Sequence, residues 1–209
     1  RFYDGKYVIY ATKSLPFDEQ KNQVCFTSEN LSDWEMQDDI IEMSGFPWAT
    51  RAIWAPTAIE KNGKYYYVFA SGDIHSTDEK GGLEIAVSDS PTGPFKAYLD
   101  RPLVNEFYNG AQPIDAHLFK DDDGTYYLYA TSGDAYGYRV MSSKNLVEWT
   151  AEGYCLHYAW DGVYDDPTWT NSYKQFWAPE VIKYDGKYYM AVSFQDGLNF
   201  AVTLYLYLH

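Results

Sequence analysis

Short runs of alternating aromatic and aliphatic residues recur along this chain, and each run begins directly after a glycine. The four glycines are Gly5, Gly63, Gly124 and Gly186, and each of them follows Asp or Asn. Asp-Gly and Asn-Gly favour tight hairpin turns, and strict alternation is typical of a β-strand with one buried face. Each glycine therefore predicts a hairpin whose second strand is the aromatic run.

Two further strands are predicted for each hairpin unit, one before the turn and one after the aromatic run. The runs before the turns are Thr57–Ile59, His117–Phe119 and Val181–Ile182, and those after the aromatic strands are Gln23–Thr27, Leu83–Val87 and Gly137–Met141. No segment of helical length repeats its apolar residues every 3.6 positions. We therefore expect an all-β protein.

The spacing of the hairpins is nearly constant. The four glycines are 58, 61 and 62 residues apart, and a fixed period indicates an array of similar units. Three or four strands in a period of about 60 residues fit a β-propeller blade, whereas a β-sandwich has no reason to repeat at this spacing. We predict a partial propeller domain over residues 1–209, with blades around residues 1–50, 51–110, 111–172 and 173–209.

About three and a half blades are expected in this chain, because residue 1 falls near the end of a first strand and the fourth repeat ends near its third. Propellers close into rings of four to eight blades, which protects the edges of their sheets. We therefore expect the sequence to be a fragment of a larger propeller.

Composition narrows the choice of partner. The net charge is −14 and the pI is about 4.5, which disfavours nucleic acid and anionic membranes. No apolar run is long enough to span a membrane. Aromatic residues make up 19% of the chain; most are expected in the core, and the remainder suit carbohydrate faces because their rings are flat and apolar. We expect a carbohydrate partner, and neither nucleic acid nor a membrane.

Metal and redox chemistry have little support in the sequence. Cys25 and Cys155 occupy different places in their repeats, so buried free thiols are expected rather than a disulfide. The acidic run 121–123 lacks the spacing of a calcium loop, and the four histidines show no zinc spacing. We expect no metal site and no required cofactor; a structural calcium ion is compatible with a propeller but has no support here.

One position stands out when the repeats are compared. Counting back nine residues from each glycine gives Trp54, Asp115 and Trp177. Equivalent positions on innermost strands converge on a propeller axis, where ligands bind, and an ionisable residue among aromatics there is a site candidate. A carboxylate satisfied by turn amides is the structural alternative, and spacing alone leaves both open. We expect Asp115 to be catalytic, and Trp54, Trp177 and Ile114 to contact the substrate.

Several motifs occur in the order found in one enzyme family. They are Ile53–Pro56, Ile85–Phe95, Arg101–Val104 and Pro113–Gly124. Together they resemble glycoside hydrolase family 43, in unbroken order over residues 1–132 and less fully to residue 193. The succession from Pro-Thr-Gly-Pro-Phe to Ile-Asp-x-x-x-Phe-x-Asp-Asp-Asp-Gly is the specific part, since Trp-Ala-Pro alone is common.

The resemblance implies a five-bladed propeller that hydrolyses arabinose- or xylose-containing glycans with inversion. It also implies three carboxylates: a base Asp in blade one, a tuning Asp in blade three and an acid Glu in blade four. Inversion needs an acid and a base with a water between them, and a third carboxylate raises the pKa of the acid by like-charge repulsion. Asp115 matches the tuning Asp.

Two departures from the family pattern affect the catalytic assignment. The base Asp would precede Arg1, and Trp177 occupies the place of the acid Glu, with Glu180 three residues further on. An odd shift along a strand turns a side chain to the opposite face. Glu180 is therefore expected to replace the acid only if a bulge intervenes.

A second registration fits residues 115–193. In this family, blade one runs from an Asp through Gly-x-Tyr-Tyr-Leu-Tyr and Ser-x-x-Leu-x-x-Trp to Trp-Ala-Pro-Glu of blade two, and these residues follow that order. Asp115 would then be the base. The rival functions are a non-catalytic carbohydrate-binding propeller and a protein-interaction propeller. The sequence does not decide the compartment, although a polysaccharide substrate favours a secreted or other extracytoplasmic protein.

Overall fold

The computed structural model describes residues 1–73, 75–76, 78, 80–105, 112–131, 136–157, 174–196 and 199–208. Within these ranges the regular structure consists of β-strands and two short 3-10 helices, η1 (Phe17–Glu19) and η2 (Met43–Gly45), without an α-helix. The all-β prediction is confirmed. In the same ranges no helix has the length and apolar character needed to cross a bilayer.

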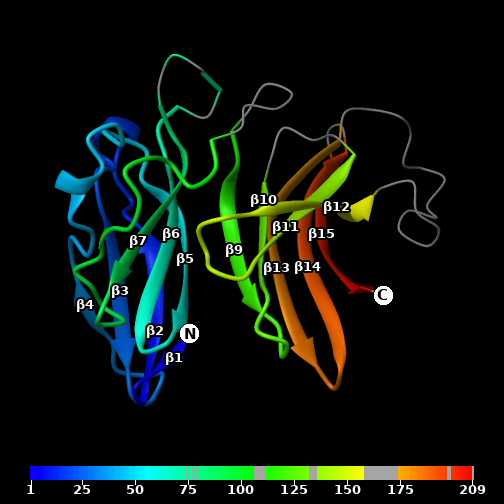
Figure 1. Cartoon of the computed structure of the whole chain (residues 1–209), viewed down its shortest axis with the longest axis horizontal. Coiled ribbons are helices and arrows are strands. Elements are labelled where there is room, and N and C mark those ends of the chain that lie inside the picture. The colour runs from blue at the N-terminus through cyan, green and yellow to red at the C-terminus, as the bar shows by residue number, and fades with distance from the viewer. Residues whose placement is uncertain are drawn as a thin grey trace. The chain divides into compact units, whose positions relative to one another are not determined.

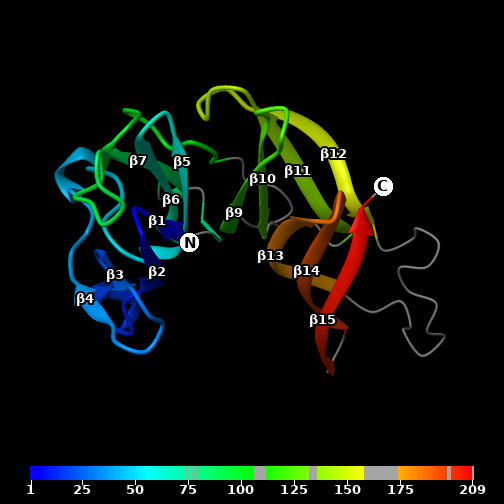
Figure 2. The same ribbon diagram turned by 90° about the horizontal axis from the view of Figure 1, so that it is seen from below.

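The strands form four sheets, in which strands that follow one another in sequence are neighbours. The first sheet contains β1 (Phe2–Tyr3), β2 (Lys6–Thr12), β3 (Gln23–Ser28) and β4 (Glu35–Gln37), and the second contains β5 (Trp54–Lys61), β6 (Lys64–Ser71), β7 (Gly82–Ser88) and β8 (Lys96–Ala97) (Figure 1). The third contains β9 (Ile114–Lys120), β10 (Tyr126–Thr131), β11 (Gly137–Ser143) and β12 (Thr150–His157), and the fourth contains β13 (Lys174–Tyr184), β14 (Lys187–Asp196) and β15 (Asn199–Leu208) (Figure 2). Every strand predicted from alternation lies within one of these strands.

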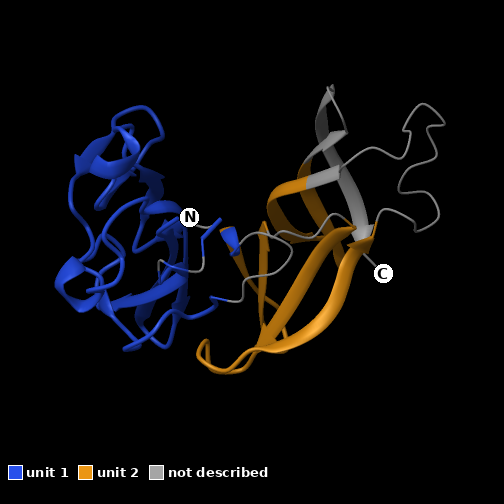
Figure 3. Cartoon of the chain, turned by 90° about the horizontal axis from the view of Figure 1, so that it is seen from above, with its two compact units in different colours: residues 1–106, 112–114 blue, residues 107–111, 115–209 orange. Residues whose placement is uncertain are grey.

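The chain divides into two compact units (Figure 3). Unit 1 comprises residues 1–106 and 112–114 and holds the first two sheets. Unit 2 comprises residues 107–111 and 115–209 and holds the other two, except for Ile114, the first residue of β9. The blade boundaries proposed above stay a prediction.

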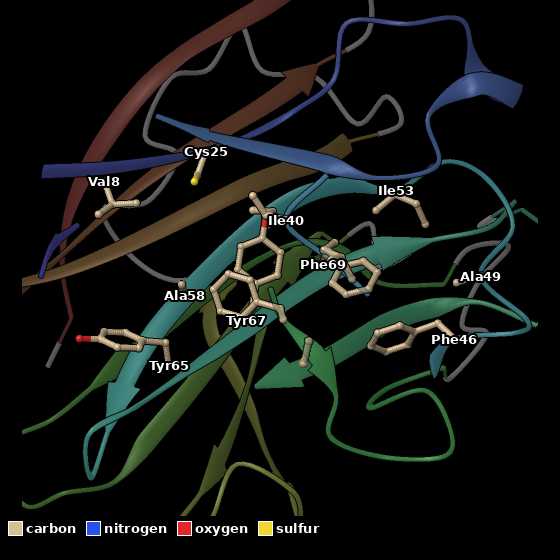
Figure 4. Close-up of a cluster of buried hydrophobic side chains, with 13 residues drawn as sticks. Val8, Cys25, Ile40, Phe46, Ala49, Ile53, Ala58, Tyr65, Tyr67 and Phe69 are labelled. Carbon is tan, nitrogen blue, oxygen red and sulfur yellow. The ribbon is translucent and has the colours of Figure 1, made fainter. Parts of the chain in front are cut away.

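The core of unit 1 is built around β6, the central aromatic strand. Every residue of β6 after Lys64 is buried, so both faces of this strand are covered. Tyr67 stacks on Phe95 with ring centroids 4.5 Å apart, and its hydroxyl donates to Gln23 Oε1 at 2.5 Å. The cluster extends from Val8 and Cys25 of the first sheet to Phe46 and Phe69 (Figure 4). The aromatic residues of this repeat are therefore largely core, as predicted.

A hydrogen bond from a tyrosine to an aspartate joins the two sheets within each unit. In unit 1 the Tyr65 hydroxyl donates to Asp4 Oδ2 at 2.6 Å, and in unit 2 the Tyr188 hydroxyl donates to Asp121 Oδ2 at 2.6 Å. In unit 2 the contact is reinforced by Lys183, whose Nζ lies 2.7 Å from Asp121 Oδ1. These bonds hold the pKa of the Asp121 carboxyl at about 2, chiefly through Lys183.

Both cysteines are free thiols, as predicted. Cys25 is buried, whereas Cys155 is only half-buried. Burial raises the pKa of Cys25 to about 11 and that of Cys155 to about 12. Both side chains are therefore protonated and unreactive near neutral pH.

Candidate functional site

The hairpin of the third sheet is one residue longer than the other three. The two-residue turns are Asp4–Gly5, Asn62–Gly63 and Asp185–Gly186, and both residues of each have positive φ. In the third sheet Asp121 N donates to Thr125 O at 2.9 Å, which leaves three residues in the loop, and of these only Gly124 has positive φ. Such three-residue loops are the next commonest hairpin type.

The predicted alignment of the strand starts is therefore wrong by one residue in the third sheet. Counted from the pair that closes each hairpin, Trp54, Ile114 and Trp177 are equivalent, and Ala55, Asp115 and Ala178 are equivalent. The second set has φ values of 44°, 52° and 44°, and positive φ is uncommon outside glycine. The alternation that predicted the strands carries no information on turn length, so the extra residue was missed.

Asp115 is held at the start of β9 by a side chain from the neighbouring strand β10. The Thr131 hydroxyl donates to Asp115 Oδ2 at 2.8 Å, and Thr131 Oγ1 accepts the backbone N–H of Ala178 at 2.7 Å. Asp115 is half-buried. Burial raises the pKa of its carboxyl, and the hydrogen bond from Thr131 lowers it in part. One hydroxyl thus connects the carboxylate to β13 of the next sheet.

Trp177 and Glu180 lie on opposite sides of a β-bulge in β13. Trp177 pairs with Ser193 and Glu180 pairs with Ala191, so the two residues of β13 between these pairs oppose a single residue of β14. Because cross-strand partners share a face and Ser193 and Ala191 are two residues apart, Trp177 and Glu180 point to the same face. The bulge that the sequence analysis required, if Glu180 is to take the place of the acid, is therefore present. Its side chain is exposed, whereas Trp177 is half-buried.

Trp54 in unit 1 has an aromatic and polar environment. Its Nε1 donates to Gln20 Oε1, and Phe17 meets its ring edge-on with centroids 5.4 Å apart. The Arg51 guanidinium lies 4.9 Å from the centroid of the Phe17 ring. A half-buried indole beside hydrogen-bonding groups is suited to contact with a sugar. Trp54 and Ile114 belong to unit 1 and Asp115 to unit 2, so the prediction that they share a pocket stays a prediction.

The acidic run 121–123 is engaged by neighbouring side chains. Asp121 and Asp122 bond to Lys183, and Asp123 accepts from Thr125. Among the residues that the structure describes, no group of three or more His, Cys, Asp or Glu side chains is placed to hold a metal ion.

Sequence reasoning missed a buried carboxylate, Glu84 on β7. Its side chain is fully buried, and its Oε1 accepts from Trp48 Nε1 and Ser71 Oγ, each at 2.9 Å. Glu84 Oε2 has no partner among the described residues, and neither has Oε1 of buried Gln112. Burial raises the pKa of the Glu84 carboxyl. The available signal was a glutamate between apolar residues in the strand predicted over Leu83–Val87.

Replacing Glu84 with Gln should stabilise the protein near pH 7 by about 1–2 kcal/mol, because a buried, partly unsatisfied charge is removed. The raised pKa means that the folded state holds its proton more tightly, so stability falls as pH rises from the unfolded pKa through the folded one. The gain should therefore vanish near pH 4. Urea unfolding at both pH values measures it, with exposed Glu29→Gln as the control; a loss of stability at pH 7 would contradict the expectation.

The comparisons with known proteins agree on one family. The family model for glycosyl hydrolases family 43 matches residues 1–136 and again residues 123–206. The chain is 34% identical over 139 residues to Beta-D-galactofuranosidase xynD of Aspergillus niger, covering 62% of this chain and 40% of that protein. It is 28% identical to a Xylosidase/arabinosidase of Bacteroides ovatus, covering 68% of this chain and 44% of that protein.

A solved structure supports the same grouping. A thermostable family-43 glycoside hydrolase superposes with a TM-score of 0.71 at 28% identity, covering 91% of this chain and 61% of that one. The chain spans less than half the length of the two curated relatives named above. The predicted fold class, an all-β propeller of the five-bladed type, is confirmed, with three four-stranded sheets and one three-stranded sheet described here. The chain belongs to glycosyl hydrolase family 43.

Proposed function

We propose that this protein is a glycoside hydrolase that cleaves arabinose- or xylose-containing plant glycans with inversion, using Asp115 as a catalytic carboxylate. The observation that carries the proposal is the geometry of Asp115, a half-buried carboxylate at a strand start with positive φ. Only one of its oxygens accepts a hydrogen bond from the described residues. Its second oxygen is left for a water or a substrate hydroxyl.

The repetition of unit 1 features in unit 2 supports the base role for Asp115. In unit 1 the Thr12 hydroxyl accepts the backbone N–H of Ala55 at 2.9 Å, as Thr131 accepts that of Ala178. The Ser-x-Asn-Leu turn also recurs in the first sheet of each unit, with Ser28 Oγ and Ser143 Oγ accepting backbone N–H groups in the same way. These repeats support the registration in which residues 115–193 follow the blade-one to blade-two order.

Glu180 is the proposed acid. The bulge in β13 turns it to the face of Trp177, and its exposure leaves it reachable by a leaving-group oxygen. Inverting hydrolysis requires the base and the acid to stand about 6.5–9.5 Å apart with water between them. Trp54, Trp177 and Ile114 are the proposed sugar contacts, because they occupy one equivalent position in three sheets.

The test is a proton NMR assay with aryl xylosides, aryl arabinofuranosides, xylo-oligosaccharides and arabino-oligosaccharides. It uses both the 209-residue chain and the chain with its natural flanking sequence. We expect the first sugar signal to be that of the inverted anomer, and Glu180→Gln to slow cleavage most for substrates with poor leaving groups. A retained anomer, or binding without cleavage in both proteins, would contradict the proposal; the second result would indicate the carbohydrate-binding alternative.

A further inference from the structure

The Thr131 hydroxyl makes two hydrogen bonds whose directions are fixed by chemistry. A backbone N–H can only donate, so the 2.7 Å contact with Ala178 N uses a lone pair of Thr131 Oγ1. The single hydroxyl proton is then directed at Asp115 Oδ2, 2.8 Å away. The hydroxyl therefore cannot rotate without losing one of the two bonds.

The two carboxylate oxygens of Asp115 therefore have different surroundings. Oδ2 is occupied by Thr131, whereas Oδ1 has no hydrogen-bond donor among the described residues. Among the described residues, burial and Thr131 are the two influences on the ionisation of Asp115, and neither involves a charged group.

We propose that Thr131 is a positioning residue for the proposed reaction, fixing Asp115 so that Oδ2 is tied to β13 through Ala178 and Oδ1 faces the reacting water. The inference rests on the proposed function. The hydrogen bond favours the ionised carboxylate, which is the form that a base requires. It thus opposes the burial that raises the pKa of the same carboxyl.

Unit 1 supplies a matched control. Thr12 accepts the backbone N–H of Ala55 as Thr131 accepts that of Ala178, and no described carboxylate accepts the Thr12 hydroxyl. Thr12→Val and Thr131→Val therefore leave the same kind of backbone N–H unsatisfied. Only Thr131→Val also removes a donor from Asp115, so the difference between the two variants isolates that bond.

The experiment titrates the Asp115 carboxyl by carbon NMR in the 209-residue chain, which needs no turnover. We expect Thr131→Val to raise the Asp115 pKa, Thr131→Ser to restore it, and Thr12→Val to leave it unchanged. If Thr131→Val does not fold, Thr131→Ala is titrated in its place. An unchanged pKa in the Thr131 variant, or an equal rise in the Thr12 variant, would overturn the inference.

The second experiment measures kinetics with whichever of the two proteins, the 209-residue chain or the chain with its natural flanking sequence, hydrolyses the substrate. Thr131→Val should lower kcat about tenfold with KM changed less than about twofold, because a bond to a charged group is lost at the reacting carboxylate and not in substrate binding. A rise in KM alone would overturn the positioning role. If Asp115→Asn leaves hydrolysis unchanged, the proposed function fails, while the titration still tests the contact between Thr131 and Asp115.

Discussion

Replacing Asp115 with Asn should lower kcat at least about 100-fold, because removal of a general base costs two to four orders of magnitude. The fold should survive. Asn, like Asp, tolerates positive φ, and its Oδ1 can still accept the proton of the Thr131 hydroxyl. The variant thus removes the charge and keeps the shape.

The dependence on leaving group distinguishes the two roles that the sequence left open for Asp115. Loss of a base slows aryl glycosides and oligosaccharides alike, whereas loss of a tuning carboxylate weakens the acid and slows poor leaving groups more. The control is Asp185→Asn, since the equivalent turn position in the second sheet is already Asn62. Equal turnover of Asp115→Asn and the control would refute a catalytic role.

Replacing Gly82 with Ala should lower the free energy of unfolding by about 3 kcal/mol or more, the sum of backbone strain and an overpacked contact. Gly82 has a φ of 108°, and an added Cβ would lie 2.4 Å from Val104 O and 3.0 Å from Asn105 Cα. Val104 O cannot withdraw freely, because it accepts the backbone N–H of Leu83 at 2.8 Å. The clash is therefore with backbone that is already engaged.

Gly63→Ala is the matched control in the same sheet. Gly63 has a φ of 74°, but nothing lies within 4 Å of an added Cβ. Gly63→Ala should lower the free energy of unfolding by about 1 kcal/mol, the cost of the backbone conformation alone. Urea unfolding of both variants measures the difference. Similar costs for the two substitutions would mean that the Val104 segment yields and that packing against Gly82 is not tight.

The strands could be predicted from the sequence because their determinants are local. Alternation and Asn-Gly or Asp-Gly turns lie within a few residues of one another. The prediction was thus correct for β6, where alternating aromatics fill both faces of a core strand. It was incorrect for the third hairpin, because Asp122 and Asp123 are acceptable in two-residue and three-residue loops alike.

The contacts of the candidate site are harder to predict from the sequence, because they join residues that are far apart along the chain. The sequence singles out Asp115 as a carboxylate among aromatic residues, but the Thr131 hydroxyl that holds it comes from another strand and also bonds to Ala178 of another sheet. Neither spacing nor composition encodes such a chain of bonds. The bulge that brings Glu180 to the face of Trp177 could be named only as a condition, since Trp-Ala-Pro does not reveal a register shift.

The extra residue in the Asp122–Gly124 turn has a consequence for how the repeats of such a chain are compared. It lies at the end of the hairpin remote from Asp115, and Asp115 has a positive φ like that of Ala55 and Ala178. The length of the turn therefore does not determine the backbone conformation at the start of the strand. Comparisons of related chains that are anchored on the turn glycine would displace the carboxylate by one column, whereas anchoring on the residue with positive φ keeps it aligned.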